Sequence, residues 1–276
     1  MATIRAVKML GQNFLTDRGV VSRIVDLVNP TAGDHILEIG PGQGAMTREL
    51  VSSGATVVAV ELDRRLAPLL AREFALDDNF TVVEADVLAT DLQQLLGSRS
   101  SGPWKVAANL PYNISSQVLL KFLETPRLFS HLVLMLQKEV GDRLAAPPAC
   151  KEYGILTVFC RLHFDVTREF IVKPGAFHPV PKVDSAVLSF RPLKVPRVDV
   201  GDERLFRQVV KASFSQRRKT LWNCLKSSNL LDDSDQLAAT LDSCGIDPGR
   251  RGETLTLEEF ALLTRTLLNA RISTGK

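Results

Sequence analysis

The feature that most constrains this chain is the glycine-rich stretch Glu38-Ile-Gly-Pro-Gly-Gln-Gly44, which follows an apolar run at residues 35–39 and precedes a helical pattern at residues 45–53. Glycines at such a turn let the backbone bend sharply and let a ligand approach without a Cβ in the way. Their spacing suits a nicotinamide or flavin dinucleotide and equally S-adenosylmethionine. A purely structural turn is the third possibility, so the loop alone leaves the cofactor open.

Apolar runs that favour strands alternate with helical patterns over residues 35–145, which is typical of a parallel sheet covered by helices. Two more strand patterns follow, and helical periodicity returns from Asp202 onward. We therefore predict an α/β, Rossmann-like domain at residues 1–196, including an N-terminal arm at 1–15, and a small all-α domain at 197–276. The domain should hold a mostly parallel seven-stranded sheet, with strands at residues 35–39, 56–61, 80–85, 104–109, 131–137, 163–172 and 183–191.

The composition excludes several classes of protein. Hydrophobic residues make up 45% of the 276 and charged residues 24%, which is ordinary for a globular protein. A net charge of +3 is compatible with nucleic acid but does not argue for it. The four cysteines form no C-x-x-C pair, so we expect reduced thiols and no metal site. No apolar run approaches the roughly 20 residues of a membrane span, and the first ten residues do not resemble a secretory signal, so we expect a soluble, cytoplasmic protein.

Two acids stand where a bound nucleoside would need them. Glu61 ends the second predicted strand, where its two carboxylate oxygens can accept hydrogen bonds from both ribose hydroxyls. Asp86 follows the third strand, where its carboxylate can accept from an adenine amine. Ligands of open α/β sheets bind at the carboxyl ends of the strands, and both acids lie there. Each acid could instead be a helix N-cap or a solvated turn residue.

The stretch Asn109-Leu-Pro-Tyr112, at the end of the fourth strand, predicts the chemistry. The lone pair of adenine N6 is delocalised into the ring, so acceptors that bind the N6 hydrogens favour the pyramidal nitrogen of a methyl-transfer transition state. The Asn109 side chain and the Leu110 carbonyl can be these acceptors, and Pro111 holds Leu110 extended. Tyr112 offers a flat face for a flipped base. With Glu61 and Asp86, this stretch favours a methyltransferase over a dehydrogenase.

Five stretches of the chain then carry a resemblance to a known family. They are Gly11-Gln-Asn-Phe-Leu15, the glycine-rich loop, Asn109-Leu-Pro-Tyr-Asn-Ile-Ser115, Phe177-His-Pro-Val-Pro-Lys-Val-Asp-Ser-Ala-Val187 and Phe214-Ser-Gln-Arg-Arg-Lys-Thr-Leu221. From about Gly11 to about Arg265, the chain resembles the ribosomal RNA adenine N6-dimethyltransferases. It is most similar to the bacterial small-subunit branch, which converts two adjacent adenosines near the 3′ end of that RNA to N6,N6-dimethyladenosine.

The resemblance implies roles for individual residues and partners for the chain. In the arm, Asn13 and Leu15 would close over S-adenosylmethionine, and Phe177 would stack on the target base opposite Tyr112. The other implied cofactor contacts are Gly40 at the methionine part, Glu61 at the ribose, Asp86 at the adenine amine, and Asn109, which would line both cofactor and base. The partners would be small-subunit rRNA and the assembling small ribosomal subunit, and the enzyme would be monomeric, without a metal.

The segment from Asp202 to Lys226 has a net excess of five basic residues. Arg204, Arg207 and Lys211 fall at helical spacing on one face, while Phe206, Val210 and Phe214 repeat on another. Such a charged face is often merely solvated. Beside an RNA-methylating domain it indicates phosphate contact, and we predict RNA binding by Arg204, Arg207, Lys211, Arg217, Arg218 and Lys219.

Three alternatives stay open at this point. A large-subunit rRNA enzyme of the antibiotic-resistance type shares the catalytic motifs, although Gln216–Leu221 favours the small-subunit branch. A non-catalytic RNA-binding assembly factor could keep the same fold, although the complete Asn109–Tyr112 stretch argues against it. A nicotinamide-dependent dehydrogenase is the most distant.

Overall fold

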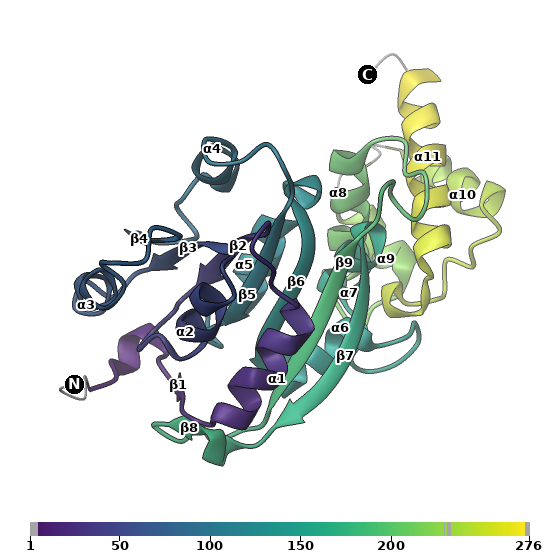
Figure 1. Cartoon of the computed structure of the whole chain (residues 1–276). Coiled ribbons are helices and arrows are strands. Elements are labelled where there is room, and N and C mark those ends of the chain that lie inside the picture. Colours follow the sequence, from purple (N-terminus) through teal and green to yellow (C-terminus); the bar gives the residue numbers. More distant parts are fainter. Residues whose placement is uncertain (1–4, 229, 231–232, 274–276) are drawn as a thin grey trace. The chain divides into compact units, whose positions relative to one another are not determined.

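The computed structural model describes residues 5–228, 230 and 233–273 and contains a seven-stranded sheet with the order β4-β3-β2-β5-β6-β9-β7 (Figure 1). The first five of these strands are mutually parallel, and β9 runs antiparallel to both β6 and β7. The mostly parallel Rossmann-like sheet predicted from the sequence is therefore confirmed. The strands are β2 (His35–Ile39), β3 (Thr56–Glu61), β4 (Phe80–Glu84), β5 (Trp104–Asn109), β6 (Phe129–Gln137), β7 (Phe164–Val172) and β9 (Ser185–Pro192).

The strand order reverses beside β2, and this reversal decides where a ligand can bind. The chain moves from β2 through β3 to β4 toward one edge, and then returns to place β5 on the other side of β2. The loops that follow β2 and β5 therefore leave in different directions, which opens a crevice at the carboxyl ends of these strands. The glycine-rich loop follows β2 and Asn109 ends β5, so the fold brings the two predicted motifs together.

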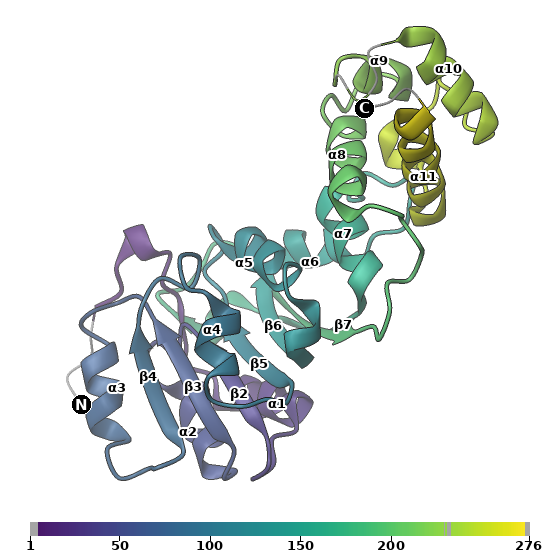
Figure 2. The ribbon, with the colours of Figure 1, turned by 90° about the horizontal axis from the view of Figure 1, so that it is seen from above.

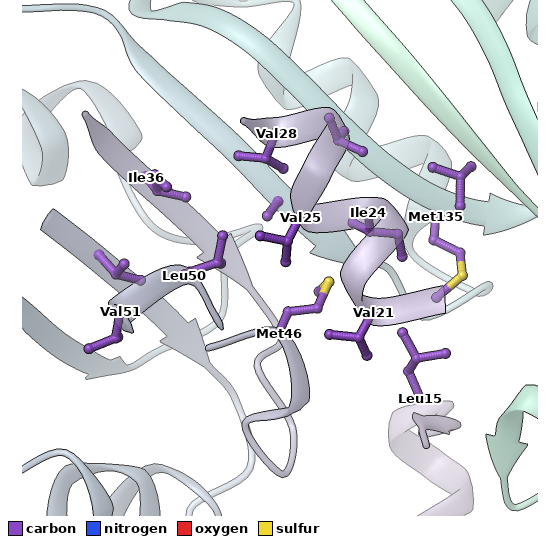
Figure 3. Close-up of a cluster of buried hydrophobic side chains, with 14 of the residues drawn as sticks. Leu15, Val21, Ile24, Val25, Val28, Ile36, Met46, Leu50, Val51 and Met135 are labelled. Carbon is purple, nitrogen blue, oxygen red and sulfur yellow. The ribbon is translucent and has the colours of Figure 1, made fainter. Parts of the chain in front are cut away.

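Helices cover both faces of the sheet, with α1 and α2 on one face and α5 on the other (Figures 1 and 2). Asp17 caps α1 by accepting hydrogen bonds from the backbone N–H groups of Gly19 and Val20 at 2.9 and 3.1 Å. Buried side chains of α1 and α2 meet those of β2 and β6 in one hydrophobic cluster (Figure 3). The helices of this part are α1 (Arg18–Val28), α2 (Ala45–Ser52), α3 (Ala67–Glu73), α4 (Leu92–Gly97) and α5 (Ser115–Phe122), and α6 (Lys138–Ala145) follows β6.

A short second sheet joins the N-terminal arm to the segment that precedes β9. Strands β1 (Phe14–Leu15) and β8 (Phe177–His178) pair antiparallel, with Leu15 opposite Phe177. Thr16 continues this contact, because its backbone N–H donates to the carbonyl of Ala176 at 2.8 Å. The arm is thus tied to the unit that holds the main sheet at Phe14–Thr16, which includes Leu15, one of the two arm residues that the resemblance assigns to the cofactor.

The chain forms two compact units, and their boundary differs in part from the predicted one. The first unit ends at Gly141 and resumes over Phe164–Lys194, while Asp142–His163 groups with the helical C-terminal part. The prediction placed residues 142–163 in the first domain. The difference arises because α7 is amphipathic and packs on the helical part, where the Phe159 ring lies 6.3 Å from that of Phe206. The helices here are α7 (Ile155–His163), α8 (Glu203–Ser213), α9 (Leu221–Lys226), α10 (Ser234–Ser243) and α11 (Leu257–Ser273).

Among the described residues, no helix is both long enough and apolar enough to cross a bilayer. Cys150, Cys160, Cys224 and Cys244 are all unpaired.

Candidate active site

The glycine-rich loop leaves an open space at the end of β2. Gly40, Gly42 and Gly44 all have positive φ, at 65°, 60° and 77°, a region that residues with a Cβ rarely adopt. The backbone N–H of Gly40 donates to the Val60 carbonyl at 2.9 Å, which ties the loop to β3. A Cβ placed on Gly40 would meet no heavy atom within 4 Å, whereas one on Gly42 would come within 3.0 Å of the Phe14 ring. Glycine at Gly40 thus preserves free volume, and glycine at Gly42 permits close packing of the arm.

Glu61 is buried beside this loop, with 5% of its surface exposed. Its Oε2 accepts from the Gly42 N–H at 3.0 Å, and its Oε1 accepts from the Asp63 N–H at 2.8 Å. Burial raises the pKa of Glu61, and the two backbone N–H groups partly offset that effect. Each carboxylate oxygen retains a lone pair, so Glu61 can still accept hydrogen bonds from a ligand.

One pocket brings together most of the predicted site residues. Its walls come from the N-terminal arm, the glycine-rich loop, the carboxyl ends of β2, β3 and β5, and the loop that follows β4. Of the residues predicted from the sequence, seven line it: Asn13, Gly40, Glu61, Asn109, Leu110, Pro111 and Tyr112. The pocket therefore joins the loop predicted for the cofactor to the stretch predicted for the target base.

Three predicted residues do not line this pocket. Asp86 is exposed, and its Oδ1 accepts from the Leu88 N–H at 2.8 Å, although its neighbours Ala85 and Val87 are lining residues. Leu15 and Phe177 face each other across β1 and β8 and belong to the hydrophobic cluster, with Phe177 only 2% exposed. The roles implied for Asp86, Leu15 and Phe177 therefore stay predictions, and a base-stacking role for Phe177 would require its ring to leave the core.

The orientation of the Asn109 amide is set by the N-terminal arm. Its Nδ2 donates to the backbone carbonyl of Asn13 at 3.0 Å, so its Oδ1 is the atom left to act as an acceptor. The Leu110 N–H donates to the Met135 carbonyl at 3.1 Å. Within the described residues, no donor contacts the Leu110 carbonyl. One side-chain oxygen and one backbone oxygen without a donor thus belong to lining residues of the pocket, of which Leu110 is only 1% exposed.

Tyr112 is anchored by its hydroxyl to the main sheet. The Tyr112 hydroxyl lies 2.7 Å from the Ser185 Oγ, and burial raises the pKa of Tyr112, so the phenol stays protonated at neutral pH. Ser185 is fully buried at the start of β9, where its backbone pairs with Gln137 on one side and Val172 on the other. The tyrosine ring is therefore held by the hydroxyl of Ser185, a residue whose backbone is paired with a strand on each side.

Gln12, Asp63 and Ser185 are site residues that the sequence did not single out. Gln12 lines the pocket and donates to the carboxylate of Asp63, and Ser185 binds Tyr112. Gln12 and Ser185 do lie inside two of the stretches that carry the family resemblance, which was the available signal. No local pattern marks Asp63, because it lies in the turn after β3 and the sequence of this turn resembles that of many ordinary turns.

The six basic residues predicted to contact RNA divide into two groups in the helical unit. Arg204, Lys211, Arg218 and Lys219 are exposed. Arg207 is half-buried, with its guanidinium 5.5 Å from the centre of the Phe159 ring. Arg217 donates to Glu253 at 2.8 Å and to the carbonyl of Lys151. The first four side chains are therefore available to a partner, whereas Arg207 and Arg217 already serve packing and charge pairing inside the unit.

Nearly the whole chain matches one family of known proteins. Residues 4–267 match the family described as ribosomal RNA adenine dimethylase. The chain belongs to this family. The ribosomal RNA small subunit methyltransferase A of Geobacter sulfurreducens is 62% identical over 97% of both chains, and that of Clostridium acetobutylicum is 44% identical over 94% of this chain and 93% of the other. The family resemblance found in the sequence is confirmed.

Two solved structures share the fold of this dimethylase-family chain. A dimethyladenosine transferase from Plasmodium falciparum superimposes with a TM-score of 0.79 at 24% identity, covering 95% of this chain and 98% of that one. The 23S rRNA methyltransferase ErmE superimposes with a TM-score of 0.68 at 27% identity, covering 92% and 99%. Identity to the curated small-subunit enzymes is thus much higher than identity to the large-subunit enzyme.

Glu38 is a further buried acid of the family's glycine-rich stretch, and it lacks a full set of partners. It is 0% exposed; its Oε2 accepts from the Thr47 hydroxyl at 2.7 Å, while its Oε1 has no hydrogen-bond partner. Burial raises the pKa of Glu38 to about 8, with a smaller contribution from the nearby charge of Glu61. Glu38 is therefore protonated in the folded protein at pH 7, with an unpaired buried polar atom directly before Ile39 and Gly40.

Glu38→Gln should make folding stability less dependent on pH. The pKa of Glu38 is about 8 in the folded protein and near 4.5 as a free side chain, so its protonation stabilises the fold fully below about pH 4.5. That contribution is lost as pH rises through 8. The measurement is urea unfolding at pH 5, 7 and 8.5. The free energy of unfolding of the variant should rise relative to that of the wild type as pH rises, by up to a few kcal/mol. Glu124→Gln, at an exposed position, is the control, and its free energy of unfolding should depend on pH as that of the wild type does.

Proposed function

We propose that the protein transfers methyl groups from S-adenosylmethionine to the N6 amines of two adjacent adenosines near the 3′ end of small-subunit (16S) ribosomal RNA, giving N6,N6-dimethyladenosine. The observation that carries this proposal is the Asn109 amide, oriented by the Asn13 carbonyl next to the free Leu110 carbonyl. The family and the names of the curated relatives support the same class of RNA. We infer a monomer that acts in the cytoplasm on the assembling small subunit.

The two RNA-related alternatives are less well supported. The large-subunit rRNA enzyme is related at 27% identity, against 62% for a small-subunit enzyme. A non-catalytic assembly factor would have no need for an amide held with its oxygen free in the pocket beside the glycine-rich loop. The arrangement of Asn109 and Leu110 therefore favours an active enzyme.

The residues of the pocket fit S-adenosylmethionine as the methyl donor. The free volume at Gly40 admits a ligand close to the backbone, and Glu61 presents a buried carboxylate suited to ribose hydroxyls. Asn13 would close over the cofactor from the arm, and Gly40 would lie against its methionine part. Asp86 is exposed beside the lining residues Ala85 and Val87, and would have to reach the adenine from there. When bound, this cofactor supplies an electrophilic methyl group on a sulfonium.

Asn109 and Leu110 perform the part of the chemistry that belongs to the chain. In the first transfer their two oxygens accept hydrogen bonds from the two N6 hydrogens of the target adenine, which turns the nitrogen lone pair out of conjugation; in the second transfer one oxygen accepts from the one N6 hydrogen that remains. The acceptors are held before the reaction begins, because the Asn13 carbonyl fixes the amide and Met135 fixes the Leu110 peptide. The methylated nitrogen is strongly acidic and loses its proton to water, so no side chain is needed as a base.

Asn109→Ala provides the test of this mechanism. Incubation of the wild type with labelled S-adenosylmethionine and unmodified small-subunit RNA should label two adjacent adenosines, located by primer extension. At saturating methyl donor, Asn109→Ala should lower kcat by about 10²–10³, by analogy with loss of an oxyanion-hole donor, because the amide acts mainly in the transition state. RNA affinity should change little, since phosphate contacts dominate it. A near-normal single-turnover rate in the variant would refute the lone-pair argument.

Tyr112 should hold the flipped base through a ring whose tilt depends on its hydroxyl. Tyr112→Phe and Ser185→Ala each remove the same hydrogen bond, worth about 0.5–1.5 kcal/mol, and should each raise the KM for RNA severalfold while kcat changes less. The double variant should be no worse than either single variant, because both changes remove one hydrogen bond. Strictly additive effects would mean that the hydroxyl pair does not position the ring. Tyr153→Phe, at the chain's other tyrosine, is the control.

The exposed basic residues of the helical unit should bind RNA phosphates. Changing Arg204, Lys211, Arg218 and Lys219 to Gln should lower RNA affinity and flatten its dependence on salt, by about 0.7–0.9 for each phosphate interaction removed in a plot of log K against log salt. Cofactor affinity should not change. Arg99→Gln/Arg127→Gln, which removes two exposed charges from the other unit, controls for net charge. If the control variant lowers RNA affinity as much per removed charge as the four changes do, then Arg204, Lys211, Arg218 and Lys219 are only solvated.

A further inference from the structure

Asp63 is a buried carboxylate that the proposed chemistry does not use. It lies two residues after β3 and is only 4% exposed. Its two oxygens accept four hydrogen bonds: one from Gln12 Nε2 at 2.9 Å and three from the Arg65 backbone N–H, Nε and Nη2 at 3.0, 2.9 and 2.6 Å. These donors keep the pKa of Asp63 low, at about 2, with Arg65 as the main cause, so the residue is charged at every physiological pH.

The same carboxylate holds the N-terminal arm at two points. Gln12 binds Asp63 through its amide nitrogen and accepts from the Val7 N–H through its Oε1 at 2.9 Å. Arg65, held by Asp63, donates to the Arg5 carbonyl at 3.3 Å. Across the described residues, the side chains that bond to residues 5–13 from outside the arm belong to Asp63, Arg65 and Asn109.

Packing alone gives the arm little support. Residues 5–7 and 9–13 are all exposed or half-buried, and Met9 is 90% exposed. Segments with few buried apolar contacts open at low free-energy cost unless hydrogen bonds retain them. Since Asp63 is buried, charged and fully bonded, its contact with Gln12 is the strongest single hydrogen bond available to hold the arm.

Asp63 touches one functional end of the pocket directly and reaches the other through the arm. Its backbone N–H donates to Glu61 Oε1 at 2.8 Å, at the end proposed for the cofactor ribose. Gln12 is followed directly by Asn13, whose carbonyl accepts from the Asn109 amide at 3.0 Å. A continuous series of contacts thus runs from Glu61 through Asp63 and Gln12 to Asn109.

We propose that Asp63 is a positioning residue that latches arm residues 5–13 over the pocket through Gln12, and thereby governs both retention of the methyl donor and orientation of the Asn109 amide. The two consequences for methyl donor and amide rest on the proposed function, whereas the latch itself does not. Asp63 contacts no substrate in this role, and it acts through Gln12 and the arm.

Reversal of the hydrogen-bond pair provides a specific test. Asp63→Asn sets an amide N–H₂ against the N–H donors of Gln12 and Arg65, and Gln12→Glu turns a carboxylate toward the carboxylate of Asp63, so each single variant opposes two groups of the same kind. When the two changes are combined, the new amide at position 63 can donate to one oxygen of the new carboxylate at position 12. The other oxygen of that carboxylate still accepts from the Val7 N–H, and the amide at position 63 keeps its own oxygen for the backbone N–H and Nε of Arg65. Arg65 Nη2 shares Oδ2 with Gln12 in the wild type and loses that acceptor in the double variant. The double variant should therefore restore the latch with its donor and acceptor exchanged.

The first measurement is amide hydrogen exchange of residues 5–13 in protein without cofactor. Each single variant should exchange about tenfold faster or more, in line with loss of a hydrogen bond to a charged group, and the double variant should exchange clearly more slowly than either single variant. Exchange in β2 and β3 reports whether the fold is intact. Arg64→Gln, at an 89% exposed neighbour in the same turn, is the control and should leave the arm unchanged.

The second measurement is binding of S-adenosylmethionine by calorimetry, with kcat at saturating cofactor. Both quantities should fall in the single variants, affinity by about tenfold, and recover in the double variant. Unchanged arm exchange in both single variants, or a double variant as fast as the singles, would overturn the latch even if methylation is normal. Faster exchange that the double variant reverses would establish the latch even if the wild type methylated no adenosine, and in that case only the proposed function would fail.

Discussion

The site depends on the two hydrogen bonds that the buried carboxylate of Glu61 accepts. This carboxylate joins the glycine-rich loop, through the Gly42 N–H, to the turn after β3, through the Asp63 N–H. Burying a carboxylate is unfavourable, as its raised pKa indicates, and the two backbone donors offset part of that cost. Because both loops donate an N–H to the same side chain, neither can move without breaking a hydrogen bond to a buried carboxyl group. The pocket is therefore rigid where the cofactor is proposed to bind and is closed by a lightly packed arm.

The main sheet could be predicted because each of its strands and turns is marked by a short, local stretch of sequence. Continuous apolar runs, as in β3, identify strands buried on both faces, and the glycine spacing identifies the turn between β2 and α2. The grouping of residues 142–163 with the helical unit could not be predicted, since it depends on which distant surface covers the apolar face of α7. That surface includes Phe206, which is 47 residues beyond Phe159 in the chain. An amphipathic pattern indicates that a face is buried but not what buries it.

The candidate site shows the same division. Gly40, Glu61 and Asn109 were predictable because a residue at a strand's carboxyl end reaches the crevice whatever the rest of the chain does. Gln12, Asp63 and Ser185 act through partners 51 or 73 residues away, and no local pattern reports such pairs. Phe177 shows the opposite difficulty: a motif can name a residue whose ring, in this structure, is packed in the core opposite Leu15.

The two groups proposed to hold the target adenine are fixed in different ways, and this difference suits their tasks. Tyr112 is tied to Ser185 on β9, a strand paired on both sides, so the stacking face belongs to the rigid sheet. The Asn109 amide is instead oriented by a carbonyl of the arm, which is held largely by hydrogen bonds. An acceptor contributes to catalysis only when it already points at the charge that develops in the transition state. In the proposed mechanism the amide therefore has its catalytic orientation only while the arm holds this position, so the hydrogen bonds that retain the arm would also prepare the acceptor for methyl transfer.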